Sequence, residues 1–142
     1  MNKLEFLQQG KLLEDRIKYT DIRINQYHQQ LESLHSTPFD REYTTGTRNL
    51  DSIQAQMIPM IMELETQSLK EKYKLLQFKR QFYQATKKLD GKDRLILEMA
   101  FIQDKSWTCI AETLCCHRTT AKDWVLKAVE MIDMPKDPVV LD

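Results

Sequence analysis

The sequence is poor in the residues that interrupt helices, with three glycines and four prolines among 142 residues. Because these two residue types mark most turns, their scarcity indicates helices throughout. No apolar run is long enough to span a membrane or to act as a signal peptide, so we expect a cytoplasmic protein with no membrane partner. The length favours one domain with a helical extension and leaves no room for a separate catalytic domain.

Cysteine is also scarce and its spacing is unfavourable for a metal. The three cysteines are an odd number and include an adjacent pair, so they form no disulfide framework. Adjacent Cys115 and Cys116, with Cys109 and His117, lack the Cys-x-x-Cys spacing of a zinc site, and we expect small buried thiols in a helical core. No nucleophile elbow, phosphate-binding glycine loop or paired carboxylates are visible. We therefore expect no metal, no cofactor and no enzyme.

The formal net charge is zero, but the charges are unevenly distributed. Residues 70–88 contain seven basic residues and one acidic residue, whereas residues 89–142 contain seven basic and ten acidic ones. A solvated helix face explains such a basic run as well as a patch that contacts a nucleic-acid backbone does. Its position before a candidate reading helix favours the second interpretation. The candidate residues of this run are Lys79, Arg80, Lys87 and Lys88.

Two long helices are predicted in the first 89 residues. In residues 2–35, apolar or small residues recur every seven positions, in two interleaved sets that are typical of a coiled coil. The sets are Phe6, Leu13, Thr20, Tyr27 and Leu34, and Ile17, Ile24 and Leu31. Pro38 and Gly46 place a loop at residues 36–50, and Asp51 or Ser52 would cap the next helix. Pro59 either kinks this helix or lies in its first turn.

The second long helix, residues 60–89, carries two apolar stripes. One consists of Ile61, Leu64, Leu75, Phe78, Phe82, Ala85 and Leu89, and is interrupted by Ser68 and Glu71. The other consists of Met62, Leu69, Leu76 and Tyr83. The simplest structure is an antiparallel hairpin, which covers only one stripe. The surplus stripe must meet the chain's own head or another subunit, and we favour a homodimer.

The residues after the hairpin are predicted to form a compact helical head. Leu89, Asp90 and Gly91 form the predicted hinge, with Gly91 ending the long helix. Residues 90–132 form three short helices, with buried faces at Leu95, Met99 and Ile102, then Trp107, Ile110, Ala111 and Leu114, then Ala121, Val125, Ala128 and Ile132. Residues 133–142, with Pro135 and Pro138, form an extended, loose tail. The predicted fold is thus all-α, a long helical hairpin (1–89) with a three-helix head.

The last two head helices are separated only by Cys115, Cys116 and His117. So short a connection forces a sharp corner, as in a helix-turn-helix, a motif that places its second helix in the major groove of DNA. The outward side chains of that helix are donors and cations suited to phosphates and base edges. They are Arg118, Thr119, Thr120, Lys122, Asp123 and Lys127. For Trp124, a lid on the core is favoured over a DNA contact.

The segment SWTCIAETLCCHRTTAKDWVLKAV resembles the fourth, promoter-reading region of bacterial sigma factors. The matching positions are Trp107, Ile110, Ala111, Glu112, Leu114, Thr120, Lys122 and Ala128. With its helical front half and the residues Gly46, Thr47 and Asp51, the chain is also similar to small prophage regulators of Gram-positive bacteria, of the ArpU and RinA type. Two positions depart from the pattern, Cys115 where glycine is usual and His117 where serine usually caps the reading helix.

The resemblance implies a sequence-specific regulator of phage genes that binds double-stranded DNA. One alternative is a small terminase subunit for DNA packaging, which also joins a helix-turn-helix to helical assembly segments and would form a ring larger than a dimer. Another is a sigma-like module that docks on RNA polymerase and binds DNA weakly alone. The excess of acidic residues after residue 89 is compatible with this second alternative.

Overall fold

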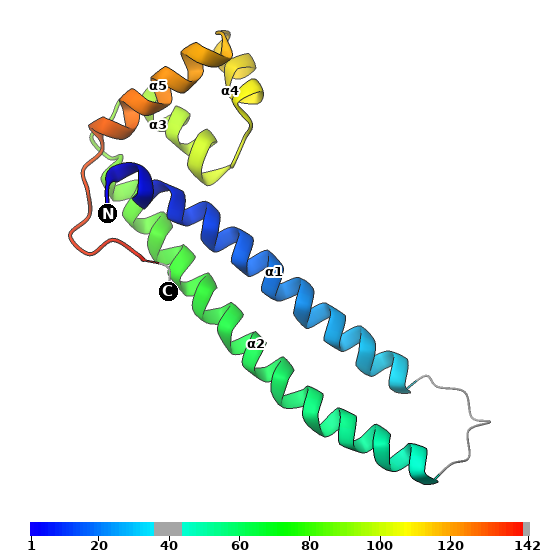
Figure 1. The fold of residues 1–142 in the computed structure, drawn as a ribbon. Coiled ribbons are helices and arrows are strands. Elements are labelled where there is room, and N and C mark those ends of the chain that lie inside the picture. Colours follow the sequence, from blue (N-terminus) through cyan, green and yellow to red (C-terminus); the bar gives the residue numbers. More distant parts are fainter. Residues whose placement is uncertain (36–43, 141–142) are drawn as a thin grey trace. The chain divides into compact units, whose positions relative to one another are not determined.

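The computed structural model describes the backbone of residues 1–35 and 44–140, and the side chains of residues 1–33 and 52–140. Every regular element in these ranges is helical (Figure 1). The elements are α1 (Lys3–His35), α2 (Thr44–Ala85), α3 (Gly91–Leu97), the π-helical η1 (Glu98–Ile102), α4 (Trp107–Leu114) and α5 (Arg118–Met131). The prediction of an all-α protein with a helical hairpin and a helical head is confirmed.

The chain divides into two compact units, and α1 and α2 contribute to both. The first unit consists of Met1–Asp15 and Tyr73–Asp142, and the second of Arg16–Lys72. The domain boundary that we expect at residue 89 therefore falls inside the first unit. Its core combines Phe6, Phe78 and Phe82 of the hairpin with Leu97 and Val125 of the head.

The second unit is an antiparallel pair of helix segments with a polar layer in its seam. Ser68 donates a hydrogen bond to Asp21 Oδ1 at 2.9 Å, and Thr20 donates to the buried Glu71 carboxylate at 3.4 Å. Gln67 donates to the same carboxylate at 3.2 Å. The polar interruption of the apolar stripe is therefore a set of paired groups. Because a slip of one helix along the other would leave them unsatisfied, they fix the alignment of α1 against α2.

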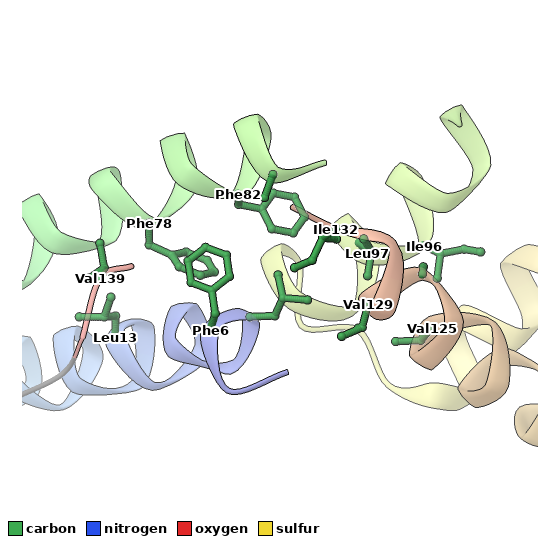
Figure 2. Close-up of a cluster of buried hydrophobic side chains, with 13 residues drawn as sticks. Phe6, Leu13, Phe78, Phe82, Ile96, Leu97, Val125, Val129, Ile132 and Val139 are labelled. Atoms are coloured by element: carbon green, nitrogen blue, oxygen red, sulfur yellow. The ribbon is translucent and has the colours of Figure 1, made fainter. Parts of the chain in front are cut away.

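In the first unit, an aromatic cluster joins α1 to α2 (Figure 2). The ring centroids of Phe6 and Phe78 lie 5.4 Å apart, and those of Phe78 and Phe82 lie 6.3 Å apart. Gly10 makes this approach possible, since a Cβ atom there would overlap the Phe78 ring. Beyond Phe82, the cluster continues into Leu97, Val129 and other head residues, so the head and the hairpin helices share one core in this unit.

The second helix begins earlier than predicted. The helix α2 already includes Thr44 to Leu50, so this part of the predicted loop is wrong, and residues 36–43 lie outside the described residues. The predicted loop depended in part on Gly46, but one glycine inside a helix costs only about 1 kcal/mol relative to alanine, so a long helix can contain it. Asp51 and Ser52 are interior residues rather than caps. Pro59 also lies inside α2, so its placement in the first turn is wrong.

The second helix also ends earlier than predicted, at Ala85 instead of Leu89, and Gly91 is the first residue of α3. The carbonyl groups at and just after the end of α2 are bonded by a side chain and a backbone N–H from later in the chain. Arg94 donates to the carbonyl oxygens of Lys87 at 2.7 Å and Thr86 at 3.3 Å. The backbone N–H of Asp133 donates to the carbonyl oxygen of Ala85 at 3.2 Å. Helix α2 thus ends without a glycine turn, and contacts from α3 and from the start of the tail bond the carbonyl groups there.

The tail is packed rather than loose as far as residue 140. The side chain of Gln81 donates to the carbonyl oxygen of Asp137 at 2.6 Å and accepts from the N–H of Val139 at 3.0 Å. Val139 is buried in the main core, and Met134 packs against it. The two prolines suggest a loose segment, whereas Met134 before them and Val139 after them anchor it to the core.

Candidate nucleic-acid interface

A three-residue corner between α4 and α5 positions the candidate reading helix. Ser106 caps α4, since its Oγ accepts from the N–H of Cys109 at 3.2 Å. At the other end, the N–H of Cys116 donates to the carbonyl oxygen of Ala111 at 3.0 Å. The N–H of Cys115 donates to the carbonyl oxygen of Glu112 at 3.2 Å. These two bonds form a Schellman motif, in which the chain turns out of the helix through a left-handed residue.

Cys115 is that left-handed residue, with φ 56° and ψ 44°. The sigma-like pattern has glycine at this position, and the structure shows why glycine would suit it. A side chain in this conformation is strained, because its Cβ crowds the backbone, and glycine avoids this contact. Cys115 is exposed, while Cys109 and Cys116 are half-buried. The expectation of buried thiols is therefore wrong for Cys115, which the turn directs to solvent.

We expect Cys115→Gly to raise the free energy of unfolding by about 0.5–1 kcal/mol. Relief of the left-handed strain, about 1–2 kcal/mol, outweighs the greater freedom that glycine adds to the unfolded chain. Chemical denaturation of the two proteins in reducing buffer measures the difference. Cys115→Ala serves as the control, because it removes the thiol and keeps the Cβ, so it should not stabilise. Equal stabilisation by both substitutions would show that the thiol, and not the backbone, is the source of the strain.

His117 caps α5 in the position where serine is usual. Its Nδ1 accepts a hydrogen bond from the N–H of Thr119 at 3.3 Å, and α5 begins at Arg118. Thr119 and Thr120 are therefore inside the helix and do not act as caps. His117 therefore satisfies one of the otherwise unpaired N–H groups of the first turn, the role that serine has in the sigma-like pattern.

The facing predicted for α5 is confirmed. Ala121, Val125, Ala128 and Ile132 are buried. Arg118, Thr119, Lys122, Asp123 and Lys127 are exposed, and Thr120 is half-buried. Trp124 is half-buried against the main core with Lys92 Nζ 4.1 Å from the ring centroid, as expected for a lid. Five of the six outward candidates therefore lie on the solvent side of the helix, and Thr120 lies at the edge of its buried face.

The basic side chains of α5 differ in the contacts that they form with the rest of the chain. Lys122 Nζ lies 5.7 Å from the centroid of the Trp107 ring, near the outer limit of a cation–π contact. Arg118 and Lys127 form no hydrogen bond or ion pair with the described part of the chain. These two side chains can therefore turn toward an external anion without breaking an internal contact.

The basic run covers the last turns of α2 and the turn that follows, where Lys87 and Lys88 lie beyond the helix end at Ala85. Lys79, Arg80 and Lys87 line a shallow groove together with Leu76, Tyr83 and Gln84. Lys88 instead pairs with Asp133 at 3.0 Å, just beyond the end of α5. Because α5 rises about 1.5 Å per residue, Arg118 lies roughly 20 Å along that helix from this pair. A spacing of this size corresponds to about six base pairs of duplex DNA.

Sequence reasoning missed the geometry that connects α3 to α4. The π-helical segment η1 closes with the N–H of Gln103 bonded to the carbonyl oxygen of Glu98 at 2.8 Å, and Asp104 follows with φ 51°. The extra residue in this turn shifts the phase of the helix. In α3, before this turn, Leu95 is exposed while Ile96 and Leu97 are buried, so the predicted position of Leu95 in the core is wrong. Three adjacent apolar residues gave no signal that could separate these alternatives.

No three His, Cys, Asp or Glu side chains of the described residues lie close enough together to hold a metal ion. None of the described helices combines the length and the apolar character needed to cross a membrane.

No protein-family model matches this chain, and neither does any curated protein or any solved structure.

Proposed function

We propose that this protein is a sequence-specific DNA-binding transcriptional regulator of phage or prophage genes, acting in the cytoplasm and without enzymatic activity. The observation that carries the proposal is the corner between α4 and α5. A Schellman turn and a capped helix start present α5 with Arg118, Thr119, Lys122, Asp123 and Lys127 exposed. A helix-turn-helix needs these features to place a helix in the major groove.

In this proposal, the start of α5 reads base edges and the basic run holds the backbone. Arg118 and Lys122 are donors of the kind that bond guanine in the major groove. Lys79, Arg80 and Lys87 add attraction to phosphates that does not depend on sequence. Lys88 contributes less, because Asp133 already neutralises it.

The test of function is a gel-shift series with DNA from the region that flanks the protein's own coding sequence. Intergenic fragments and packaging-site fragments are compared with random duplexes of equal length. Retention of an intergenic fragment at salt concentrations that release random DNA supports the regulator. Retention of a packaging-site fragment alone would favour the terminase alternative, and no retention at low salt would overturn DNA reading.

We expect Lys122→Ala to weaken specific binding by about tenfold, the effect of removing one interaction with a base, with little change in stability. Lys79, Arg80 and Lys87 changed together to Gln should weaken specific and random DNA alike. The slope of log affinity against log salt should become shallower by about 0.9 for each phosphate that the variant no longer neutralises.

The matched control for the triple change is Lys18, Arg23 and Lys136 changed to Gln, which removes the same charge from exposed positions outside the basic run. An unchanged slope for the first triple variant, or the same change for both, would mean that the basic run is only a solvated face.

Docking on RNA polymerase is the second candidate, because residues 89–142 carry an excess of three acidic residues. Such a surface disfavours tight binding to DNA by the head alone. Co-purification of the polymerase, together with failure to bind any fragment at low salt, would favour it.

A further inference from the structure

The helix α2 carries a second seam that α1 does not cover. Met62, Leu69 and Leu76 are 61%, 67% and 57% exposed, and Tyr73 is 62% exposed. Pro59 and Thr66 are exposed as well. Because α2 is unbroken across these positions, they form one stripe with alternating spacings of three and four residues, the pattern of a coiled-coil contact. We call these six residues the open seam.

The charges beside the open seam change sign at its middle. Glu63 follows Met62 and Lys70 follows Leu69, so both lie on one edge of the seam. On the other edge, Glu65 precedes Thr66 and Lys72 precedes Tyr73. Each edge thus carries an acid before the middle and a base after it. A helix with this pattern is complementary to a copy of itself running in the opposite direction.

We propose that the open seam binds the open seam of a second copy of this chain, with the two α2 helices antiparallel. Met62 then lies opposite Tyr73 of the second copy, Thr66 opposite Leu69, and Pro59 opposite Leu76. Two-fold symmetry repeats each contact. On both edges an acid meets a base, Glu63 with Lys70 and Glu65 with Lys72, as flanking positions do in antiparallel coiled coils.

Charge selects this alignment among the available ones. A shift of one heptad in one direction brings Glu63 against Glu63 and Glu65 against Glu65 of the second copy. The opposite shift brings Lys70 against Lys70 and Lys72 against Lys72. In a parallel pair, Arg80, which continues the same spacing one turn beyond the open seam, would lie against Arg80 of the second copy. Like charges in contact are destabilising, so each alternative is disfavoured.

Glu63 and Lys70 are the best positions for a test. Glu65 and Lys72 already have partners in their own chain, His28 at 3.6 Å and Asp21 at 3.6 Å. Glu63 and Lys70 form no such contact with the described residues and line one shallow groove with Met62, Thr66 and Gln67. Their substitution should leave the fold of a single chain intact.

The experiment measures molar mass by sedimentation over a concentration series, without DNA, so it does not depend on the proposed function. The unmodified chain should dimerise. Glu63→Lys alone and Lys70→Glu alone should each weaken dimerisation by about tenfold at low salt, because two symmetric pairs become repulsive. An equimolar mixture of the two variants should restore the affinity of the unmodified chain, since every pair in the mixed dimer is again opposite in charge.

Glu130→Lys is the control, because it changes the net charge as Glu63→Lys does at an exposed position outside the seam. It should leave the association constant unchanged. Leu69→Gln should weaken dimerisation at every salt concentration, since its contact is apolar. A monomer mass at high micromolar concentration, a ring of eight or more subunits, or a mixture no tighter than the separate variants would each overturn the antiparallel pair.

Discussion

Phe78→Ala should lower the free energy of unfolding by about 3–5 kcal/mol, the usual cost of removing a large aromatic side chain from a core. Phe78 is fully buried, and its ring contacts Phe6, Phe82 and the backbone of α1 at Gly10. The substitution therefore opens a cavity between two helices that the rest of the first unit cannot easily fill. Thermal and urea denaturation, followed by circular dichroism at 222 nm, a standard wavelength for helix content, measure the effect.

Tyr83→Ala is the matched control on the same helix. Tyr83 is half exposed, and its ring packs edge to face with Phe82, with the centroids 5.8 Å apart. It should cost about 1 kcal/mol. A destabilisation at Tyr83 equal to that at Phe78 would contradict the assigned facing of α2.

The contact between Gly10 and Phe78 can be tested separately, because Gly10→Ala should change stability in opposite directions with and without the Phe78 ring. In the unmodified protein, Gly10→Ala should destabilise by about 1–3 kcal/mol, because the new Cβ overlaps the ring. In the Phe78→Ala protein the space is open, and the same change should stabilise by about 1 kcal/mol through helix propensity. Equal effects in the two backgrounds would show that Gly10 and Phe78 are not in contact.

Ala121→Asp should destabilise the head by about 3–5 kcal/mol and abolish any DNA binding. Ala121 is completely buried among Met99, Ile110 and Ala111, where a carboxylate would have no partner. An isolated buried charge costs this much or more. Denaturation followed by tryptophan fluorescence is a suitable probe, since Trp107 and Trp124 both pack on the head core.

Lys122→Ala, one residue along the helix, is the comparison. It removes an exposed ammonium group near Trp107 and should change stability by less than about 1 kcal/mol. A head that tolerates Ala121→Asp as well as Lys122→Ala would have the opposite face of α5 in its core, and the candidate reading surface would be wrong.

The sequence predicted the features that depend on spacing. The buried stripes of α1, α2 and α5 recur at helical intervals, and Phe6, Leu13, Phe78, Phe82, Ala121 and Val125 are buried as expected. The three-residue corner was also predictable, because Cys115, Cys116 and His117 separate two such stripes. The outward face of α5 follows from its inward face, since a helix has a fixed period.

Some of the features that the sequence did not predict depend on contacts with other segments of the chain. Arg94 and the backbone of Asp133 end α2, and Gln81 orders the tail. Gly46 suggests a loop and Gly91 suggests a helix end, but Gly46 lies inside α2 and Gly91 is the first residue of α3. The π-helical turn of η1 likewise has no local signature, and three adjacent apolar residues do not show that Ile96 and Leu97, rather than Leu95, face the core.

The hydrogen bonds of Gln81 have a consequence for work at high ionic strength. The amide of this side chain carries no charge, yet it holds both the carbonyl oxygen of Asp137 and the N–H of Val139. Dissolved ions screen the exposed pair of Lys88 and Asp133, but they leave a neutral amide bond and an apolar contact nearly unchanged. We therefore expect the last described residues to stay packed on the core throughout a salt titration. A fall in DNA affinity during that titration would then result from screening of surface charges and not from loss of core packing.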